Sequence, residues 1–368
     1  MDARRDREHP PDDGSLIGWP PEPIGVRIRD GGEIAAALPH LLGFRPRESV
    51  VLLSLSGSGR RRVGLTVRAD IPPPDHAESL ATVLARSLCT DRPDGAVVVV
   101  VSEAPDVDRP GDPDIPHRDL VWEMVRALAA LGVPVGDALL VRGGRWWNYD
   151  CSYGCCAPDG GTPLPTQVTE LEVAAVATGT VVERDRDDLV ARIAPPPGRD
   201  RGAMAAACAR VAVECSAAVL DSGMEAVAAE SWSAVTDAAA RCRPGAPAVD
   251  RLTDTEVARV VWGLRDVDVR DLALGLALGD EPAAAEQLWT ECTRRAPAPL
   301  DAAPATLLAV SAWLRGDGAM ANVALGRALE SEPGYGLARL LGDALAACVT
   351  PADLRAMLTE VGATPPVG

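Results

Sequence analysis

The sequence of 368 residues contains no lysine, so all 36 of its basic residues are arginine. Walker-type phosphate loops, protein kinases, Schiff-base enzymes and serine–lysine hydrolases all need a lysine amine or ammonium. The absence of lysine therefore excludes these four classes. Aromatic residues are also scarce, with one Phe, three Tyr and eight Trp. The apolar mass is Ala, Val and Leu, which favours closely packed helices.

The chain also lacks excess positive charge and long apolar runs. Its net charge of −17 argues against general nucleic-acid binding and against binding to an anionic membrane surface. The first residues, Met1–Glu8, are polar and predict no signal peptide. The longest purely apolar run, Ala96–Val101, is too short to cross a bilayer. We therefore expect a cytoplasmic protein whose nine cysteines are mostly reduced thiols.

The N-terminal part of the chain begins with a proline-rich segment. Residues 1–24 have the composition of a disordered leader, and Val26–Arg29 predicts a short strand. Asp30 then offers a helix N-cap with Glu33 at the capping-box position. Pro39 lies inside the apolar stripe of that helix, so we expect the helix to be kinked or short.

Strands and helices alternate over the residues that follow. The two segments 49–55 and 63–67 predict an antiparallel hairpin, and the run 96–101 predicts a central strand covered on both faces. We expect helices at 77–89 and 120–131, an acidic loop at 103–119 and a strand at 138–142. Thr169 with Glu172 predicts a further short helix. Together these patterns predict a mixed α/β sheet with helices on its faces.

The second half of the chain is Ala-rich and predicts helices alone. They are expected at 201–221, 224–241, 253–264, 282–295, 304–315, 318–331 and 336–347. The segment 302–335 partly fits the tetratricopeptide frame, which predicts a tetratricopeptide-like helical hairpin. The predicted organisation is a leader (1–24), a mixed α/β domain (25–192), a Pro-rich linker (193–201), an α-helical domain (202–350) and a C-terminal helix and tail (351–368).

Arginine, aromatic and cysteine residues concentrate in the stretch 142–156, directly after a predicted strand. Ligands of open α/β sheets bind beyond the carboxyl ends of strands, so the position suits a binding site. The candidate ligand-binding residues combine guanidinium groups for an anion with rings for stacking, and they are Arg142, Arg145, Trp146, Trp147 and Tyr149. The alternative is a β-hairpin whose large rings cover one edge of the sheet.

Three cysteines close this stretch and leave several interpretations open. Cys151, Cys155 and Cys156 are candidate metal ligands, with zinc as the metal considered, although structural zinc usually takes four ligands. A labile disulfide or redox pair and partly buried structural thiols are the alternatives. A cysteine nucleophile needs a nearby base, which only the fold could bring from His40 or His117.

Several blocks of the sequence resemble one family. They are Val26-Arg-Ile-Arg-Asp, Leu38-Pro-His-Leu-Leu-Gly-Phe-Arg-Pro-Arg-Glu-Ser-Val-Val, Gly144-Arg-Trp-Trp-Asn-Tyr-Asp-Cys, Cys155-Cys156-Ala-Pro-Asp-Gly-Gly-Thr-Pro-Leu-Pro, Ala305-Thr-Leu-Leu-Ala and Gly316-Asp-Gly-Ala-Met-Ala-Asn-Val-Ala-Leu. Over residues 26–348 the chain resembles the domain of unknown function (DUF) 4192 family. The resemblance implies a cytosolic protein of GC-rich bacteria, and it supplies no reaction and no catalytic residue.

The sequence thus favours a non-enzymatic interaction or regulatory protein, because no complete catalytic constellation is recognisable. The alternative is a small-molecule-binding domain or an enzyme with its site at 142–156. A protein or a small molecule is the expected partner, while the cofactor and the oligomeric state stay open.

Overall fold

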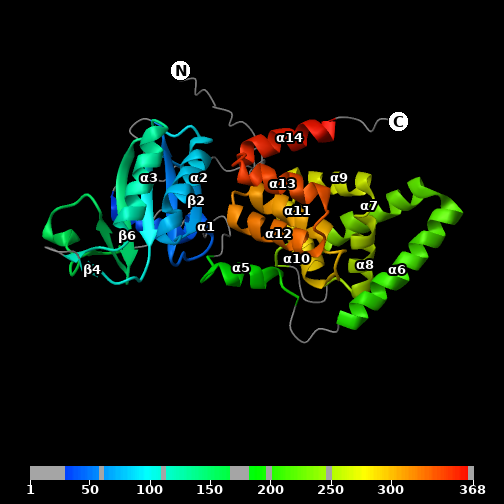
Figure 1. Cartoon of the computed structure of the whole chain (residues 1–368). Helices are drawn as coiled ribbons and strands as arrows, with labels where there is room; N and C mark the ends of the chain where they lie inside the picture. Colours follow the sequence, from blue (N-terminus) through cyan, green and yellow to red (C-terminus); the bar gives the residue numbers. More distant parts are fainter. Residues whose placement is uncertain are drawn as a thin grey trace, which may run out of the picture.

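A computed structural model describes residues 30–57, 62–108, 113–165, 182–195, 201–245 and 251–363. Its N-terminal part is a sheet with helices on both faces, and its C-terminal part is built of helices (Figure 1). The predicted fold class is therefore confirmed. The leader, the predicted strand Val26–Arg29 and the predicted helix beginning at Thr169 lie outside the described residues, as does most of the Pro-rich linker.

The described residues form a six-stranded mixed sheet in the order β2-β1-β3-β6-β7-β8. Strand β3 pairs with β1 antiparallel and with β6 parallel, and the other neighbours are antiparallel. A separate ribbon joins β4 and β5. The strands are β1 (Ser49–Ser56), β2 (Arg62–Asp70), β3 (Gly95–Val101), β4 (Val107–Asp108), β5 (Pro113–Asp114), β6 (Val135–Arg142), β7 (Arg145–Asn148) and β8 (Thr162–Pro163). The predicted hairpin and the central position of β3 are both confirmed.

Each face of the sheet belongs to a different apolar cluster. Val98 of β3 packs with α2 (Ala77–Cys89) and α3 (Arg118–Ala130), whereas its neighbour Val99 packs on the side of α1 (Gly31–Leu42). Because successive strand residues point to opposite faces, a strand covered on both sides needs an unbroken apolar run. The cluster on the α1 side continues into the helical part, so the two parts share buried contacts.

Helix α1 begins as its sequence predicts. The Asp30 side chain accepts a hydrogen bond from the Glu33 backbone N–H at 2.9 Å, which satisfies one of the unpaired amides of the first turn. The helix continues through Pro39 to Leu42. It ends at Gly43, whose φ of 74° is a left-handed conformation that glycine adopts without strain.

The C-terminal part consists of helices. They are α5 (Arg186–Ile193), α6 (Arg201–Ser222), α7 (Met224–Arg241), α8 (Asp254–Gly263), α9 (Val267–Gly275), α10 (Pro282–Arg295), α11 (Ala302–Leu314), α12 (Gly318–Ser331), α13 (Gly336–Ala346) and α14 (Pro351–Ala363). All seven helices predicted between 201 and 347 are present, α14 lies where the C-terminal helix was predicted, and α5 and α9 are additional. Helix α5 contacts α10 and α12 (Figure 1). Helices α11 and α12 form a closely packed pair, and their tetratricopeptide likeness stays a prediction.

One helix in the described residues, α6, is long and apolar enough to pass a length-and-composition test for crossing a membrane, a test that helices of soluble proteins also pass. Its apolar side chains are largely uncovered, and Leu220 is 90% exposed. Helix α6 projects at the far end of the molecule from the sheet (Figure 1).

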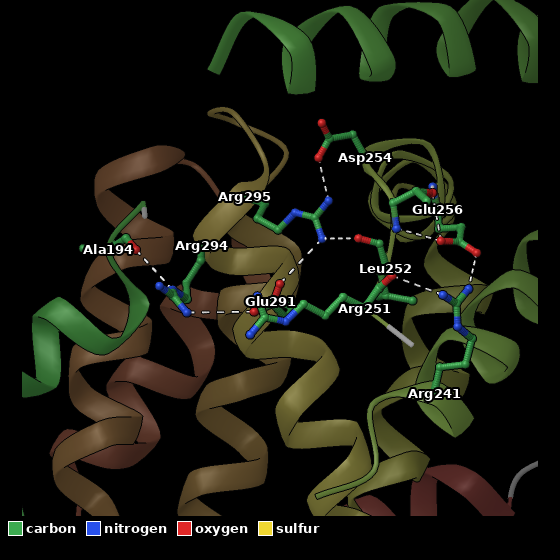
Figure 2. Close-up of polar contacts among 10 residues, drawn as sticks. Ala194, Arg241, Arg251, Leu252, Asp254, Glu256, Glu291, Arg294 and Arg295 are labelled. Atoms are coloured by element: carbon green, nitrogen blue, oxygen red, sulfur yellow. Dashed lines mark hydrogen bonds and ion pairs between the residues drawn. The ribbon is translucent and has the colours of Figure 1, made fainter. Parts of the chain in front are cut away.

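A buried arginine ties the connections of the helical part together (Figure 2). The Arg295 side chain is only 2% exposed, and it donates to the Leu252 carbonyl at 2.7 Å and to Asp254 at 2.5 Å. Glu291 lies one turn earlier, with its carboxylate 3.6 Å from the same guanidinium. Since a buried charge must be paired to be tolerated, Arg295 fixes the start of α8 against α10.

Candidate functional site

The stretch 142–156 begins with a β-hairpin between β6 and β7. Gly143 and Gly144 form its two-residue turn, with φ values of 56° and 72° that glycine adopts readily. Trp146 and Trp147 follow as neighbours in β7, so they point to opposite faces of the sheet. The stretch therefore begins with a hairpin, as the alternative in the sequence analysis had it, but its two Trp rings lie on opposite faces of the sheet.

Trp147 is buried against the cysteine loop, which is the connection 149–161 between β7 and β8. Its ring is 3% exposed, and its Nε1 donates to the Ala157 carbonyl at 3.0 Å. The Arg142 guanidinium lies over the ring at 4.8 Å from the centroid, close enough for a cation–π interaction. A Cβ added to Gly161 would come within 2.5 Å of the Trp147 ring. The ring thus packs directly against the backbone that follows the cysteines.

Trp146 lies on the other face, against the start of α1. Cβ atoms added to Gly31 and Gly32 would come within 2.9 and 2.8 Å of its ring. The two glycines therefore allow the close approach of α1 to β7. The structure brings Trp147 and Arg142 together and separates Trp146 from them.

Both candidate anion-binding arginines are engaged within the fold. Arg142 donates to the Ala104 carbonyl at 3.0 Å and forms an ion pair with Asp106 at 2.8 Å. Arg145 donates to the carbonyls of Gly160 and Gly161 at 3.1 and 2.7 Å. These contacts hold the acidic loop and the cysteine loop on the hairpin. Binding of an external anion by either arginine stays a prediction.

Tyr149 is buried at the end of the same hairpin. Its hydroxyl donates to the Pro116 carbonyl at 2.6 Å, and burial raises the pKa of that hydroxyl well above its usual range. The Arg118 guanidinium lies 5.5 Å from the ring centroid and donates to the Tyr149 carbonyl at 2.9 Å. Tyr149 therefore joins β7 to the start of α3, and its predicted role in ligand binding is untested.

The three cysteines converge on the connection between β7 and β8. The Sγ atoms of Cys151 and Cys155 are 3.8 Å apart, and those of Cys155 and Cys156 are 4.0 Å apart. All three Sγ atoms lie within 4.8 Å of one another. A short 3-10 helix, η2 (Gly154–Cys156), turns the adjacent thiols toward Cys151. In the part of the chain that the structure describes, no His, Asp or Glu joins this group of candidate metal ligands.

The three thiols differ in their surroundings. Cys155 is exposed, and the other two are partly covered. A backbone hydrogen bond from Tyr153 lowers the pKa of the Cys151 thiol, whereas burial raises the pKa of Cys156 to about 11. The Asn148 backbone N–H donates to the Cys156 sulfur at 3.3 Å, and the Gly161 N–H donates to the Cys155 carbonyl at 2.8 Å. The first of these bonds holds the loop to β7, and the second closes the loop on itself.

A second polar cluster, formed by Glu48, Ser102 and His117, was not predicted from the sequence. Ser102 follows β3, and its Oγ lies 2.8 Å from the Glu48 carboxylate and 2.9 Å from His117 Nε2. His117 was expected only as a base for the cysteines, and its ring contacts Ser102. A polar residue directly after a buried strand, at a carboxyl end, is the signal that marks Ser102 in the sequence.

The family model of a domain of unknown function, DUF4192, matches residues 32–352. The chain belongs to the DUF4192 family. The match covers the sheet, the cysteine loop and the helical part through the start of α14, so the resemblance expected from the sequence blocks is confirmed. No curated protein and no solved structure matches the chain.

Proposed function

We propose that this DUF4192 chain is an interaction or regulatory protein that binds one thiophilic metal ion, with zinc as the preferred ion, through Cys151, Cys155 and Cys156. The convergence of the three sulfur atoms within 4.8 Å carries the proposal. Thiolates are the ligands that zinc prefers, with Zn–S bonds of about 2.3 Å.

The sulfur spacing supports a tetrahedral centre. Two ligands on a tetrahedron with bonds of about 2.3 Å lie about 3.8 Å apart. The sulfur atoms of Cys151 and Cys155 are separated by 3.8 Å, and those of Cys155 and Cys156 by 4.0 Å. The Cys151 and Cys156 sulfur atoms lie within 4.8 Å of each other, so metal binding requires only a small movement that brings these two closer. The loop is thus organised for binding before the ion arrives.

The surroundings of the thiols support the same function. The Asn148 N–H that donates to Cys156 would stabilise the negative charge of a thiolate. The net charge of −17 favours the approach of a cation over that of an anion. A reducing cytoplasm, which we propose as the location, would keep the thiols available for the metal ion.

Three protein ligands leave the fourth position of a tetrahedral ion open. A water molecule or a residue of a protein partner would complete the centre, and the exposed Cys155 sets that position at the surface. An open position at the surface suits a regulatory centre whose occupancy changes what the protein contacts. We assign no reaction to the cysteines.

Metal analysis of the purified, reduced full-length chain tests the proposal. After incubation with zinc sulfate and dialysis, we expect about one zinc ion per chain in the wild type. The triple variant C151S/C155S/C156S should bind no stoichiometric zinc. The matched control C89S/C348S, which removes two cysteines outside the cluster, should bind zinc like the wild type. A wild type without zinc, or a triple variant that keeps zinc, would show the proposal to be wrong.

A further inference from the structure

The hydrogen bonds of Ser102 fix the state of the histidine beside it. A serine hydroxyl has one proton to donate and two lone pairs to accept with, and an ionised carboxylate only accepts. The hydroxyl proton therefore goes to Glu48, whose Oε2 is 2.8 Å away. The two remaining contacts of Oγ are with the Ala104 N–H at 3.1 Å and with His117 Nε2 at 2.9 Å. The proton of a neutral His117 consequently lies on Nε2.

This tautomer leaves the lone pair of His117 on Nδ1. The part of the chain that the structure describes places no hydrogen bond on that atom, and the residue is partly exposed. A proton can bind to Nδ1 without breaking any bond of the cluster, since Nε2 stays a donor to Ser102. The Glu48 carboxylate stabilises the imidazolium that results. These are the properties that a general base requires.

The backbone of the cluster is held in an unusual conformation. Glu48 has a φ of 39° and His117 a φ of 65°, and these are two of only four non-glycine residues with positive φ in the described ranges. Left-handed conformations of such residues persist only where the surrounding structure enforces them, and they are enriched at functional sites. Here they aim the Glu48 and His117 side chains at Ser102 from two separate segments of the chain.

The cluster also lies where the fold favours a site. Strands β3 and β6 are parallel, and Ser102 and Gly143 follow their carboxyl ends. The Gly143 N–H donates to Glu103 at 3.1 Å, which joins the two strand ends. Ser102 itself is 1% exposed and has all three hydrogen-bonding positions occupied, so it cannot serve as a nucleophile.

We propose that His117 Nδ1 is the general base of a hydrolytic site for uncharged esters, with Ser102 and Glu48 as its positioning residues. Nδ1 takes a proton from a water molecule whose oxygen attacks the acyl carbon. The C–O bond to the alcohol then breaks, and the imidazolium returns its proton to the departing alcohol. The charges nearby are the carboxylates of Glu48 and Glu103 and the Arg118–Asp114 pair, so the site disfavours esters that carry a negatively charged phosphate or free carboxylate group. The proposal is independent of metal binding by the cysteines.

Hydrolysis of p-nitrophenyl acetate by the full-length chain tests this function. Because the chain has no lysine, few amines react directly with the ester. Cysteine thiols become acetylated once and release an initial burst of p-nitrophenol, so the rate is measured in the steady state after the burst. We expect the steady-state rate of H117Q to be at least about a hundredfold lower, the low end for a general base. The control H76Q changes an exposed histidine and should keep the wild-type rate. A wild type no faster than free imidazole, or an H117Q variant at the wild-type rate, overturns the proposal.

A pH profile separates a positioning role from a merely structural one. Burial lowers the pKa of His117, and the charge of Glu48 raises it. In E48Q we therefore expect the acidic limb of kcat/KM to move to lower pH, and an unmoved limb contradicts the positioning role. Nitrogen NMR of the His117 ring in the wild type tests the proposal even if a variant fails to fold. At pH 7 the proposal requires a protonated Nε2 and an unprotonated Nδ1, and the opposite tautomer overturns it.

Discussion

Replacing Gly161 by alanine should loosen the anchor between Trp147 and the cysteine loop. Gly161 has a φ of 82°, and an alanine in a left-handed conformation costs about 1–2 kcal/mol. The new Cβ would also lie 2.5 Å from the Trp147 ring, which is 3% exposed and hydrogen-bonded through Nε1. Forcing extra volume into such a packed site costs a further ~1–3 kcal/mol. We therefore expect G161A to lower the free energy of unfolding by about 2–5 kcal/mol.

The variant G144A separates these two contributions. Gly144 has a φ of 72°, and nothing lies within 4 Å of an added Cβ. Urea unfolding of G144A should therefore report the backbone cost alone, and G161A should be less stable by the further ~1–3 kcal/mol. The Gly161 N–H donates a hydrogen bond to the Cys155 carbonyl, so a displacement of residue 161 should lower the zinc affinity of G161A about tenfold. The zinc affinity of G144A should be unchanged. Equal stability of the two variants would refute the packing of Trp147 on Gly161.

Three further predictions concern the rest of the molecule. Replacing Arg295 by methionine should cost about 1–3 kcal/mol in urea unfolding, because the hydrogen bonds that Arg295 donates to Asp254 and to the Leu252 carbonyl are lost. The variant R294M, at a more exposed ion pair, should cost less than about 1 kcal/mol. The variant T253A should cost about 1 kcal/mol, because the capping box of α8 is lost. Burial lowers the pKa of His117 below 6.5, so on acidification the unfolded chain binds a proton at this histidine before the folded chain does. The free energy of unfolding should therefore fall as the pH drops below 6.5. H117Q should remove this part of the pH dependence, and an unchanged slope of unfolding free energy against pH would contradict it.

The regular elements were predictable because their signals are local. The apolar run 96–101 marks a strand covered on both faces, and Asp30 and Thr253 mark helix starts that the structure confirms. Helix α9 was missed although Asp266 caps it, because it is only nine residues long and carries a weak apolar stripe. Local patterns predict an element well where several signals agree, and poorly where the element is short.

The candidate site was only partly predictable, for two physical reasons. The density of aromatic residues predicted one site at 142–156, but the alternation of β7 sends Trp146 and Trp147 to opposite faces, so no single surface carries both rings. The cluster of Glu48, Ser102 and His117 joins residues far apart in the chain, and only the sheet topology brings them together. Spacing along the sequence therefore pointed to the three cysteines as one local group, whereas the contacts among Glu48, Ser102 and His117 could be found only in the fold.

X-ray absorption at the zinc edge of the zinc-loaded, full-length chain tests the central claim most directly. The three-thiolate centre predicts three sulfur neighbours at about 2.3 Å and one lighter neighbour at about 2.0–2.2 Å. A zinc ion surrounded only by nitrogen and oxygen, or a chain that takes up no zinc under reducing conditions, would contradict the claim that Cys151, Cys155 and Cys156 form a metal centre.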